Sequence, residues 1–264
     1  MAWLRRHLLL FAAVAVLLYM LLPNVVVAVF SFNDPVGRYN YTWTEFSTRA
    51  WTNPCGPQGL CDALGLSLRI GLIASLVATV FGTMIAFALG RYRFRARSGT
   101  NLLIFMPMAT PEVVMGSSLL TLFLMMGVPS GGLAITIAHI MFCVSFVVVA
   151  VKARVATLDP RLEEAAADLG ANPTQTFLRV TFPLAAPGIL AGALLAFSLS
   201  FDDYIITNFN ASPSSITFPM YVWGAAQRGA PVQVNVIGTV MFIAALAIVL
   251  VSQLLTSRRQ RAAA

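Results

Sequence analysis

Six long stretches of the chain are almost entirely apolar, and each is long enough to cross a membrane as a helix. A hydrocarbon core about 30 Å thick requires roughly 20 apolar residues in helical form. The stretches cover residues 8–30, 64–89, 102–126, 133–151, 185–206 and 234–255. They predict an all-α membrane protein with six transmembrane helices. Pro107, Pro111 and Glu112 interrupt the third stretch, so the pattern defines its ends and its straightness least well.

The composition fits a membrane environment better than water. Hydrophobic residues make up 58% of the chain and charged residues 10%, whereas soluble domains carry about 25% charged residues. The net charge of +7 would suit nucleic-acid binding only if the basic residues formed a solvated face. They lie instead in short clusters between apolar stretches. We therefore expect contact with membrane lipid and no binding of nucleic acid.

The basic residues also predict the orientation of the chain, because Lys and Arg are enriched in short cytoplasmic loops. With the N-terminus inside, the outside segments hold only Arg38, Arg49 and Arg228, and Arg69 lies at the start of the second stretch. We expect a multi-pass protein of the cytoplasmic (inner) membrane with both termini in the cytoplasm. The inside segments then hold Arg5, Arg6, Arg91, Arg93, Arg95, Arg97, Lys152, Arg154, Arg161, Arg179, Arg258, Arg259 and Arg261.

Residues 31–63 form the predicted external loop, which contains two cysteines around a short Gly/Pro turn. Cys55 and Cys61 would form a disulfide if the loop faces an oxidising compartment. Two free thiols are the alternative that the sequence leaves open. Cys143 lies in the fourth stretch, and we interpret it as a small packing residue.

The most informative cytoplasmic segment follows the fourth stretch, at about residues 159–183. Residues 159–160 and 172–173 each combine an N-cap residue with proline, which is typical of a helix start. Gly170 fits a left-handed cap at the end of the first short helix. Pro183 is expected to end the second one. The segment is therefore predicted to be a helix–turn–helix on the inner face of the membrane.

The surface of this segment is unusual because two glutamates, Glu163 and Glu164, precede three consecutive alanines. Small side chains let another protein approach the helix backbone, and a carboxylate can make charge-assisted hydrogen bonds to it. An ordinary connector between two membrane helices is the alternative interpretation. A DNA-reading helix–turn–helix is not expected, because an acidic helix repels phosphate.

The pattern Glu164-Ala165-Ala166-x-x-x-Gly170, followed after nine residues by Val180-x-Phe182-Pro183, resembles the signature of ABC importer permeases, with every spacing met. The resemblance implies a type I importer permease bundle, with residues 1–264 as a single transmembrane domain. It implies that the segment docks into a separate ATP-hydrolysing subunit. The residues implied in this coupling are Glu163, Glu164, Ala165, Ala166, Gly170 and Pro183.

The same family resemblance implies the partners and the substrate class. The partners would be a second permease subunit, two ATP-binding subunits and an extracytoplasmic substrate-binding protein. Residues 91–95, 111–116 and 200–204 look like the spermidine/putrescine permease branch, which implies a polyamine or a similar small cation. The alternatives are another small solute, or a stand-alone secondary transporter coupled to protons.

Three carboxylates lie inside apolar stretches, where a charge is costly and usually faces a cavity or a partner. Our hypothesis is that Glu112 and one of Asp202 and Asp203 line a path for a cationic substrate. Alternatively, Glu112 bonds to a neighbouring helix and the two aspartates are solvated at an outer opening. His139, in the fourth stretch, is interpreted as a neutral imidazole bonded to a neighbouring helix, with a proton relay as the alternative.

Several kinds of chemistry have no support in the sequence. The only lysine, Lys152, is followed by Ala153, so the chain has no phosphate-binding Gly-Lys-Ser/Thr loop. Two histidines and three cysteines give no metal-ligand spacing. We expect no catalytic residue, no metal and no cofactor bound by this chain. ATP would be used by the partner subunits.

Overall fold

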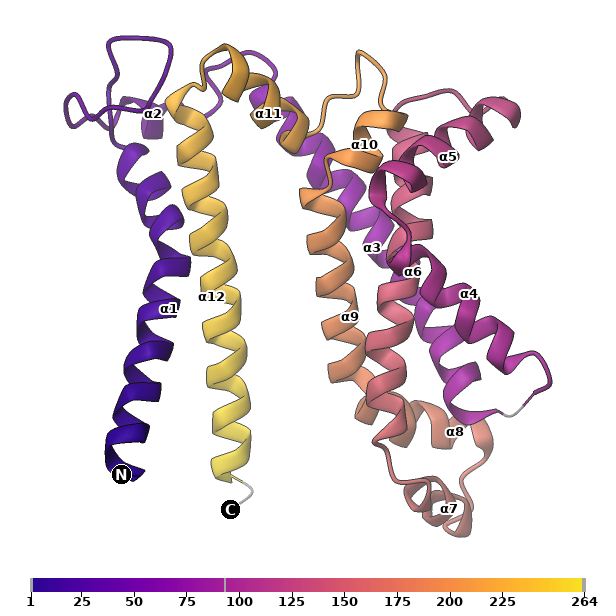
Figure 1. Cartoon of the computed structure of the whole chain (residues 1–264). Helices are drawn as coiled ribbons and strands as arrows, with labels where there is room; N and C mark the ends of the chain where they lie inside the picture. The colour runs from indigo at the N-terminus through magenta and orange to yellow at the C-terminus, as the bar shows by residue number, and fades with distance from the viewer. Residues whose placement is uncertain (1, 93, 263–264) are drawn as a thin grey trace. The chain divides into compact units, whose positions relative to one another are not determined.

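The structure is helical throughout the part of the chain that it describes. The computed structural model covers residues 2–92 and 94–262, with side chains for residues 6–92, 94–248 and 250 (Figure 1). Within these ranges there is no β-strand beyond an isolated bridge between Asn33 and Phe46. The all-α prediction is confirmed. The topology prediction also used five basic residues whose side chains the structure does not describe: Arg5, Arg93, Arg258, Arg259 and Arg261.

The chain divides into two compact units, which we describe separately. Unit 1 combines Met1–Cys61 with Val222–Ala264, and unit 2 is Asp62–Tyr221. The single permease domain expected over residues 1–264 stays a prediction.

Unit 1 is built on two long helices, α1 (Ala2–Phe30) and α12 (Val232–Ala262), which lie side by side (Figure 1). The chain termini are at one end of this pair. The polar loop that contains the short helix α2 (Arg49–Thr52) is at the other end. Apolar side chains along α1, such as Phe11 and Tyr19, are exposed. An apolar surface of this extent requires lipid or another protein around it.

Unit 2 is organised around α6 (Gly132–Ala156), which packs against α9 (Phe182–Asp202). Because α6 is apolar on all sides, it can be buried within a bundle. Its Phe142 and Val147 belong to the main core cluster, together with Leu89 of α3 (Leu60–Arg91). The remaining elements are α4 (Arg97–Ala109), α5 (Glu112–Met125), α7 (Arg161–Asp168), α8 (Pro173–Thr176), the π-helical segment η1 (Phe177–Thr181), α10 (Ile205–Asn210) and α11 (Phe218–Arg228).

Four helical stretches are each long and apolar enough to cross a membrane, considering only described residues. They are Arg6–Phe30, Leu60–Arg91, Gly132–Ala156 and Pro173–Asp202. The bent pair formed by α4 and α5 makes a fifth if it counts as one span. The described apolar part of α12, Val232–Ile248, is shorter than these spans. Six spans therefore remain a prediction.

The third predicted stretch is not a continuous helix. Its two parts, α4 and α5, are bent by 106°. Thr110 has an extended backbone with φ −80° and ψ 130°, because the proline that follows it disfavours the helical conformation. Pro111 then stands at the N-cap of α5. Pro111 thus changes the direction of the chain, whereas Pro107 lies inside α4.

Candidate functional site

The segment between α6 and α9 starts with the short helix α7, which has a hydrogen-bonded turn at each end. The carboxylate of Asp159 accepts a hydrogen bond from the backbone N–H of Arg161 at 3.0 Å. At the other end Gly170 has φ +83°, which favours glycine. Ala171 N–H donates to the Ala166 carbonyl at 3.0 Å, and Gly170 N–H donates to Ala167 at 2.9 Å. These two bonds form a Schellman motif, so the predicted left-handed cap is confirmed.

The second short helix starts as predicted but does not stop at Pro183. Asn172 and Gln175 form a reciprocal capping box, with bonds of 3.0 and 2.9 Å. From Pro173 the chain then runs through α8, η1 and α9 as one stretch to Asp202. The prediction that Pro183 ends the helix is wrong. Pro183 lies in the first turn of α9, directly after the π-helical turn η1. The wider turn changes the hydrogen-bond register, so the missing N–H is tolerated.

The coupling residues expected on α7 divide between an inner and an outer face. Glu164 and Ala165 are exposed, and Ala166 is half-buried. Leu169, at the end of α7, is 90% exposed. Glu163 instead accepts hydrogen bonds from Arg91 and from Thr181, both at 2.8 Å. Only the outer face is free to meet a partner.

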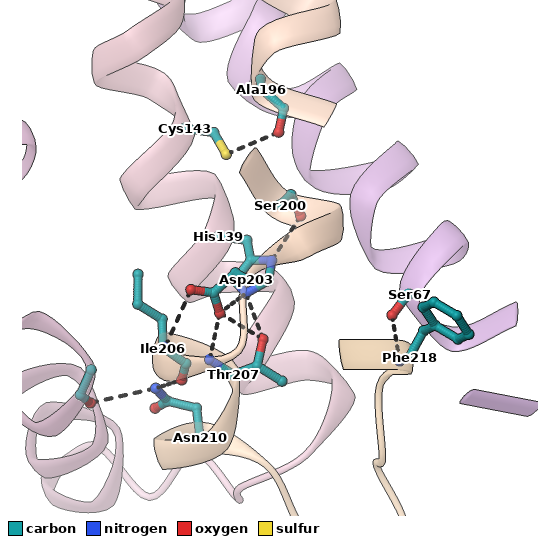
Figure 2. A network of polar contacts seen from close by, with 11 residues as sticks. Ser67, His139, Cys143, Ala196, Ser200, Asp203, Ile206, Thr207, Asn210 and Phe218 are labelled. Atoms are coloured by element: carbon teal, nitrogen blue, oxygen red, sulfur yellow. Dashed lines mark hydrogen bonds and ion pairs between the residues drawn. The ribbon is translucent and has the colours of Figure 1, made fainter. Parts of the chain in front are cut away.

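A second polar site lies at the other end of unit 2, where α6, α9 and α10 meet (Figure 2). His139 Nδ1 is 2.7 Å from Ser200 Oγ. His139 Nε2 is 3.2 Å from Asp203 Oδ2 and 3.0 Å from Thr207 Oγ1. His139 is therefore bonded to a neighbouring helix, as the first interpretation of this residue expected.

Asp203 also determines where the fifth predicted stretch breaks. Its Oδ2 accepts the backbone N–H of Thr207 at 2.7 Å and the Thr207 hydroxyl at 2.8 Å. Such bonds satisfy donors at the start of a helix, here α10. The backbone of Asp203 is extended, with ψ 125°. The expectation of one helix over residues 185–206 is wrong, because the carboxylate of Asp203 starts a new helix.

The two neighbouring aspartates have different environments. The side chain of Asp203 is 5% exposed, so solvation at an outer opening is wrong for this residue. Asp202 is exposed. Among the described contacts, the carboxylate of Asp203 is occupied by His139 and Thr207. Asp202 is therefore the aspartate available to a mobile cation in this conformation.

Glu112 lies in the first turn of α5 and is exposed. A carboxylate is favourable there because the helix N-terminus carries partial positive charge. One turn further on, α5 contacts α10 at Gly116. A Cβ at this position would lie 2.8 Å from the ring of Phe209 and 3.3 Å from the Cα of Ile206. The structure thus joins α5 to α10, although none of the described hydrogen bonds or ion pairs links Glu112 to Asp202 or Asp203.

In unit 1, Cys55 and Cys61 are joined in a disulfide, with their Cα atoms 5.4 Å apart. This decides between the two alternatives that the sequence left open. Cys143 is fully buried, and its thiol lies 3.4 Å from the Ala196 carbonyl. It is a packing residue of the core of unit 2. No group of His, Cys, Asp or Glu side chains that could hold a metal ion occurs among the described residues.

Several partners of the site residues were not identified from the sequence. Arg91 and Thr181 bind Glu163, and Ser200 and Thr207 bind His139. The only sequence signal was that Ser200 lies within the stretch 200–204 singled out for its family resemblance. Each of these contacts joins two different helices and spans many turns of the chain, so the pattern within one helix carries no information about it.

A model of the family "Binding-protein-dependent transport system inner membrane component" matches residues 78–262. The chain belongs to this family. The matched region contains α7, Gly170 and the break at Asp203. As a member of the binding-protein-dependent inner membrane component family, the protein is a permease component of an ABC importer.

Two permeases from Escherichia coli (strain K12) are similar in sequence to most of this chain. It is 34% identical to the spermidine/putrescine transport system permease protein PotC, over 91% of this chain and 90% of the relative. It is 36% identical to the putrescine transport system permease protein PotI, over 83% of this chain and 80% of the relative. The likeness to this branch of permeases is therefore confirmed.

A solved structure shows the same fold with little sequence similarity. It is a bacterial ABC transporter involved in the import of the acidic polysaccharide alginate, which covers 96% of both chains with a TM-score of 0.67 and 17% identity. At this identity the match concerns the fold alone. The importer permease fold is confirmed, and the substrate has to be argued from relatives and from side chains.

Proposed function

We propose that this chain is one of two permease subunits in an importer for a polyamine or a similar small cation. Two separate ATP-binding subunits drive the importer, and an extracytoplasmic substrate-binding protein supplies it. The polyamine assignment is supported by the 34% and 36% identity to permeases named for spermidine and putrescine. In this proposal the chain crosses the membrane six times, with both termini in the cytoplasm.

The outer face of α7 is the observation that carries the proposed coupling to ATPase subunits. Glu164 and Asp168 are exposed and four residues apart, so they form an acidic edge on one side of the helix. Ala165 and Leu169 form an apolar row beside it by the same spacing. Leu169 stands 90% exposed at an ordered, capped turn. A partner cleft with an apolar pocket and a basic rim would fit this face.

The rigidity of the segment also supports a coupling role. Moving an access equilibrium from 1:99 to 99:1 requires about 5.5 kcal/mol of differential interaction. A flexible loop would absorb a displacement. The Schellman motif at Gly170 and the capping box at Asn172 instead hold α7 and α8 in a defined geometry. Closure of the ATPase subunits would therefore move the segment as a body.

The exposed carboxylates support a cationic cargo. Glu112 and Asp202 are both exposed, and a fixed negative charge attracts ammonium groups while repelling anions. These side chains would not favour an acidic cargo, such as the alginate named for the transporter of similar fold. The chain itself would bind neither ATP nor another cofactor and would catalyse no reaction.

The test of the proposed function is transport by the reconstituted assembly. The chain is purified with its cognate partner subunits, placed in proteoliposomes and supplied with radiolabelled spermidine or putrescine and the soluble receptor. We expect uptake only when ATP is present on the side of the membrane where the ATPase subunits are bound. Uptake by the chain alone, driven by a pH gradient, would overturn the proposal in favour of a proton-coupled carrier.

Docking through α7 is tested by Leu169→Asp. Burying a leucine contributes about 1.5–3 kcal/mol, so its loss should weaken binding of the ATPase subunits about 10- to 100-fold. Val36→Asp is the matched control, because Val36 is 93% exposed in the predicted external loop. Equal affinities of the two variants for the ATPase subunits would exclude Leu169 from the docking surface.

A further inference from the structure

Glu163 is distinct from the other side chains of α7. All eight residues of this helix are described, and Glu163 is the only one whose side chain hydrogen-bonds or ion-pairs with another helix. One oxygen, Oε1, accepts both bonds, from Nη2 of Arg91 and from the hydroxyl of Thr181, each at 2.8 Å. Arg91 ends α3, and Thr181 is the last residue of η1. Three elements therefore meet at one atom, and we call this arrangement the Glu163 clamp.

The Glu163 clamp is partly shielded from water, which strengthens its bonds. The side chains of Arg91 and Glu163 are 21% and 32% exposed, and Thr181 is buried. Nε of Arg91 is buried and has no acceptor among the described atoms. Arg91 thus depends on Glu163 for its pairing, because an unpaired buried charge is costly.

Aromatic packing holds the same helices together. The ring of Phe87 on α3 packs edge-to-face on Phe177 of η1, with 5.4 Å between centroids. This contact places the end of α3 against η1 independently of the clamp. Glu163 adds α7 to an existing joint between α3 and the stretch that leads into α9.

The clamp is also the direct polar link from α7 to α3. Through the backbone, α7 connects only to α6, by residues 157–160, and to α8, by residues 169–172. The chain provides no such link to α3. Among the described contacts, the ion pair between Glu163 and Arg91 is the one hydrogen-bonded or ionic link from α7 to that helix. This pair is therefore the direct polar contact through which a movement of α7 acts on α3.

We propose that Glu163 is a positioning residue that transmits the displacement of α7 to α3 and α9, and that it does not bind the ATPase subunit. This rests on the proposed function, in which the outer face of α7 docks on that subunit. Glu164 and Leu169 then hold the partner, and Glu163, whose side chain contacts α3 and η1, passes the motion to two membrane helices. Loss of Glu163 should uncouple hydrolysis from transport without preventing assembly.

The experiment compares Glu163→Ala with the wild type in the complete assembly, in proteoliposomes, with spermidine as the transported probe. We expect the ATPase subunits to co-purify in normal amounts and ATP hydrolysis to persist. Uptake per ATP hydrolysed should fall about fivefold or more, in the range of typical coupling energies. The exchange of both residues, Arg91→Glu with Glu163→Arg, should restore most of this ratio.

Two further variants keep the test decisive if Glu163→Ala does not fold. Thr181→Val removes one of the two donors at nearly constant volume, and we expect uptake per ATP to fall about twofold or more. Glu45→Ala is the control, because Glu45 is an exposed carboxylate of the predicted external loop and lies outside the coupling segment. Its uptake per ATP should equal that of the wild type.

The outcomes separate this proposal from the proposed function. Absence of ATP-dependent uptake in the wild type would overturn the function itself. With an active wild type, normal uptake per ATP in Glu163→Ala and Thr181→Val would overturn the clamp. Loss of the ATPase subunits from Glu163→Ala would also overturn it, by making Glu163 a docking residue.

Discussion

Nε2 of His139 lies 3.2 Å from Oδ2 of Asp203, although 64 residues separate them in the sequence. Their side chains are 2% and 5% exposed. Because Asp203 also caps the first turn of α10, this contact ties the break between α9 and α10 to α6. The direction that the chain takes after α9 is thus determined by a residue from another helix.

Removing this carboxylate should destabilise unit 2. Asp203→Ala removes the carboxylate that contacts His139 and accepts the first N–H groups of α10, and we expect a loss of about 3 kcal/mol. The measurement is the thermal unfolding midpoint of the detergent-solubilised protein. Asp202→Ala is the control, because an exposed side chain should change stability by at most about 0.5 kcal/mol. Equal midpoints for the two variants would contradict the structural role of Asp203.

Gly170→Val should impair coupling through the backbone alone. The position has φ +83°, and a Cβ there would have no atom within 4 Å, so crowding is not involved. A β-branched residue in the left-handed region costs about 1–3 kcal/mol, and we expect lower uptake per ATP. Gly170→Asn is the matched control, since asparagine tolerates this conformation. If the valine variant transports normally, the Schellman turn is not required for coupling.

The state of the three cysteines can be read by thiol counting. In unfolded, unreduced protein only Cys143 should react with a maleimide, because Cys55 and Cys61 are paired. After reduction three thiols should react. In the native protein Cys143 should react slowly, because it is fully buried. Three reactive thiols without reductant would show that the loop disulfide is absent.

Features that depend on neighbouring residues could be predicted from the sequence. The turn at Asp159 that precedes α7, the helix start at Asn172 and the left-handed cap at Gly170 follow from residue type within one turn. Residues 8–30 and 64–89 were also recognised as helical, because their apolar stretches are long and uninterrupted.

Features that depend on tertiary contacts could not be predicted in this way. No proline or glycine marks the break after Asp202, and the Asp203 carboxylate that starts α10 is also held by His139 from α6. The local rule for Pro183 failed because a π turn accommodates it. Glu163 and Glu164 are neighbours of identical chemistry, and only the positions of Arg91 and Thr181 distinguish the bound Glu163 from the exposed Glu164.

The last prediction concerns the path of the substrate. Glu112 and Asp202 are exposed, so neutralising either one should leave assembly and stability nearly unchanged while weakening attraction to a polyamine. If each charge contributes about 1 kcal/mol to the cation in the path, Glu112→Gln and Asp202→Asn should each lower uptake at limiting spermidine about fivefold. Uptake at equal membrane expression is the measurement.

Glu45→Gln is the control for this experiment, because Glu45 is an exposed carboxylate of the predicted external loop. It removes the same charge from a position outside the proposed path and should leave uptake unchanged. Unchanged uptake in Glu112→Gln would remove Glu112 from the path. An equal decrease in all three variants would mean that the overall charge of the surface, and not a defined path, attracts the cation. The path is therefore supported only if Glu112 and Asp202 are more sensitive than Glu45.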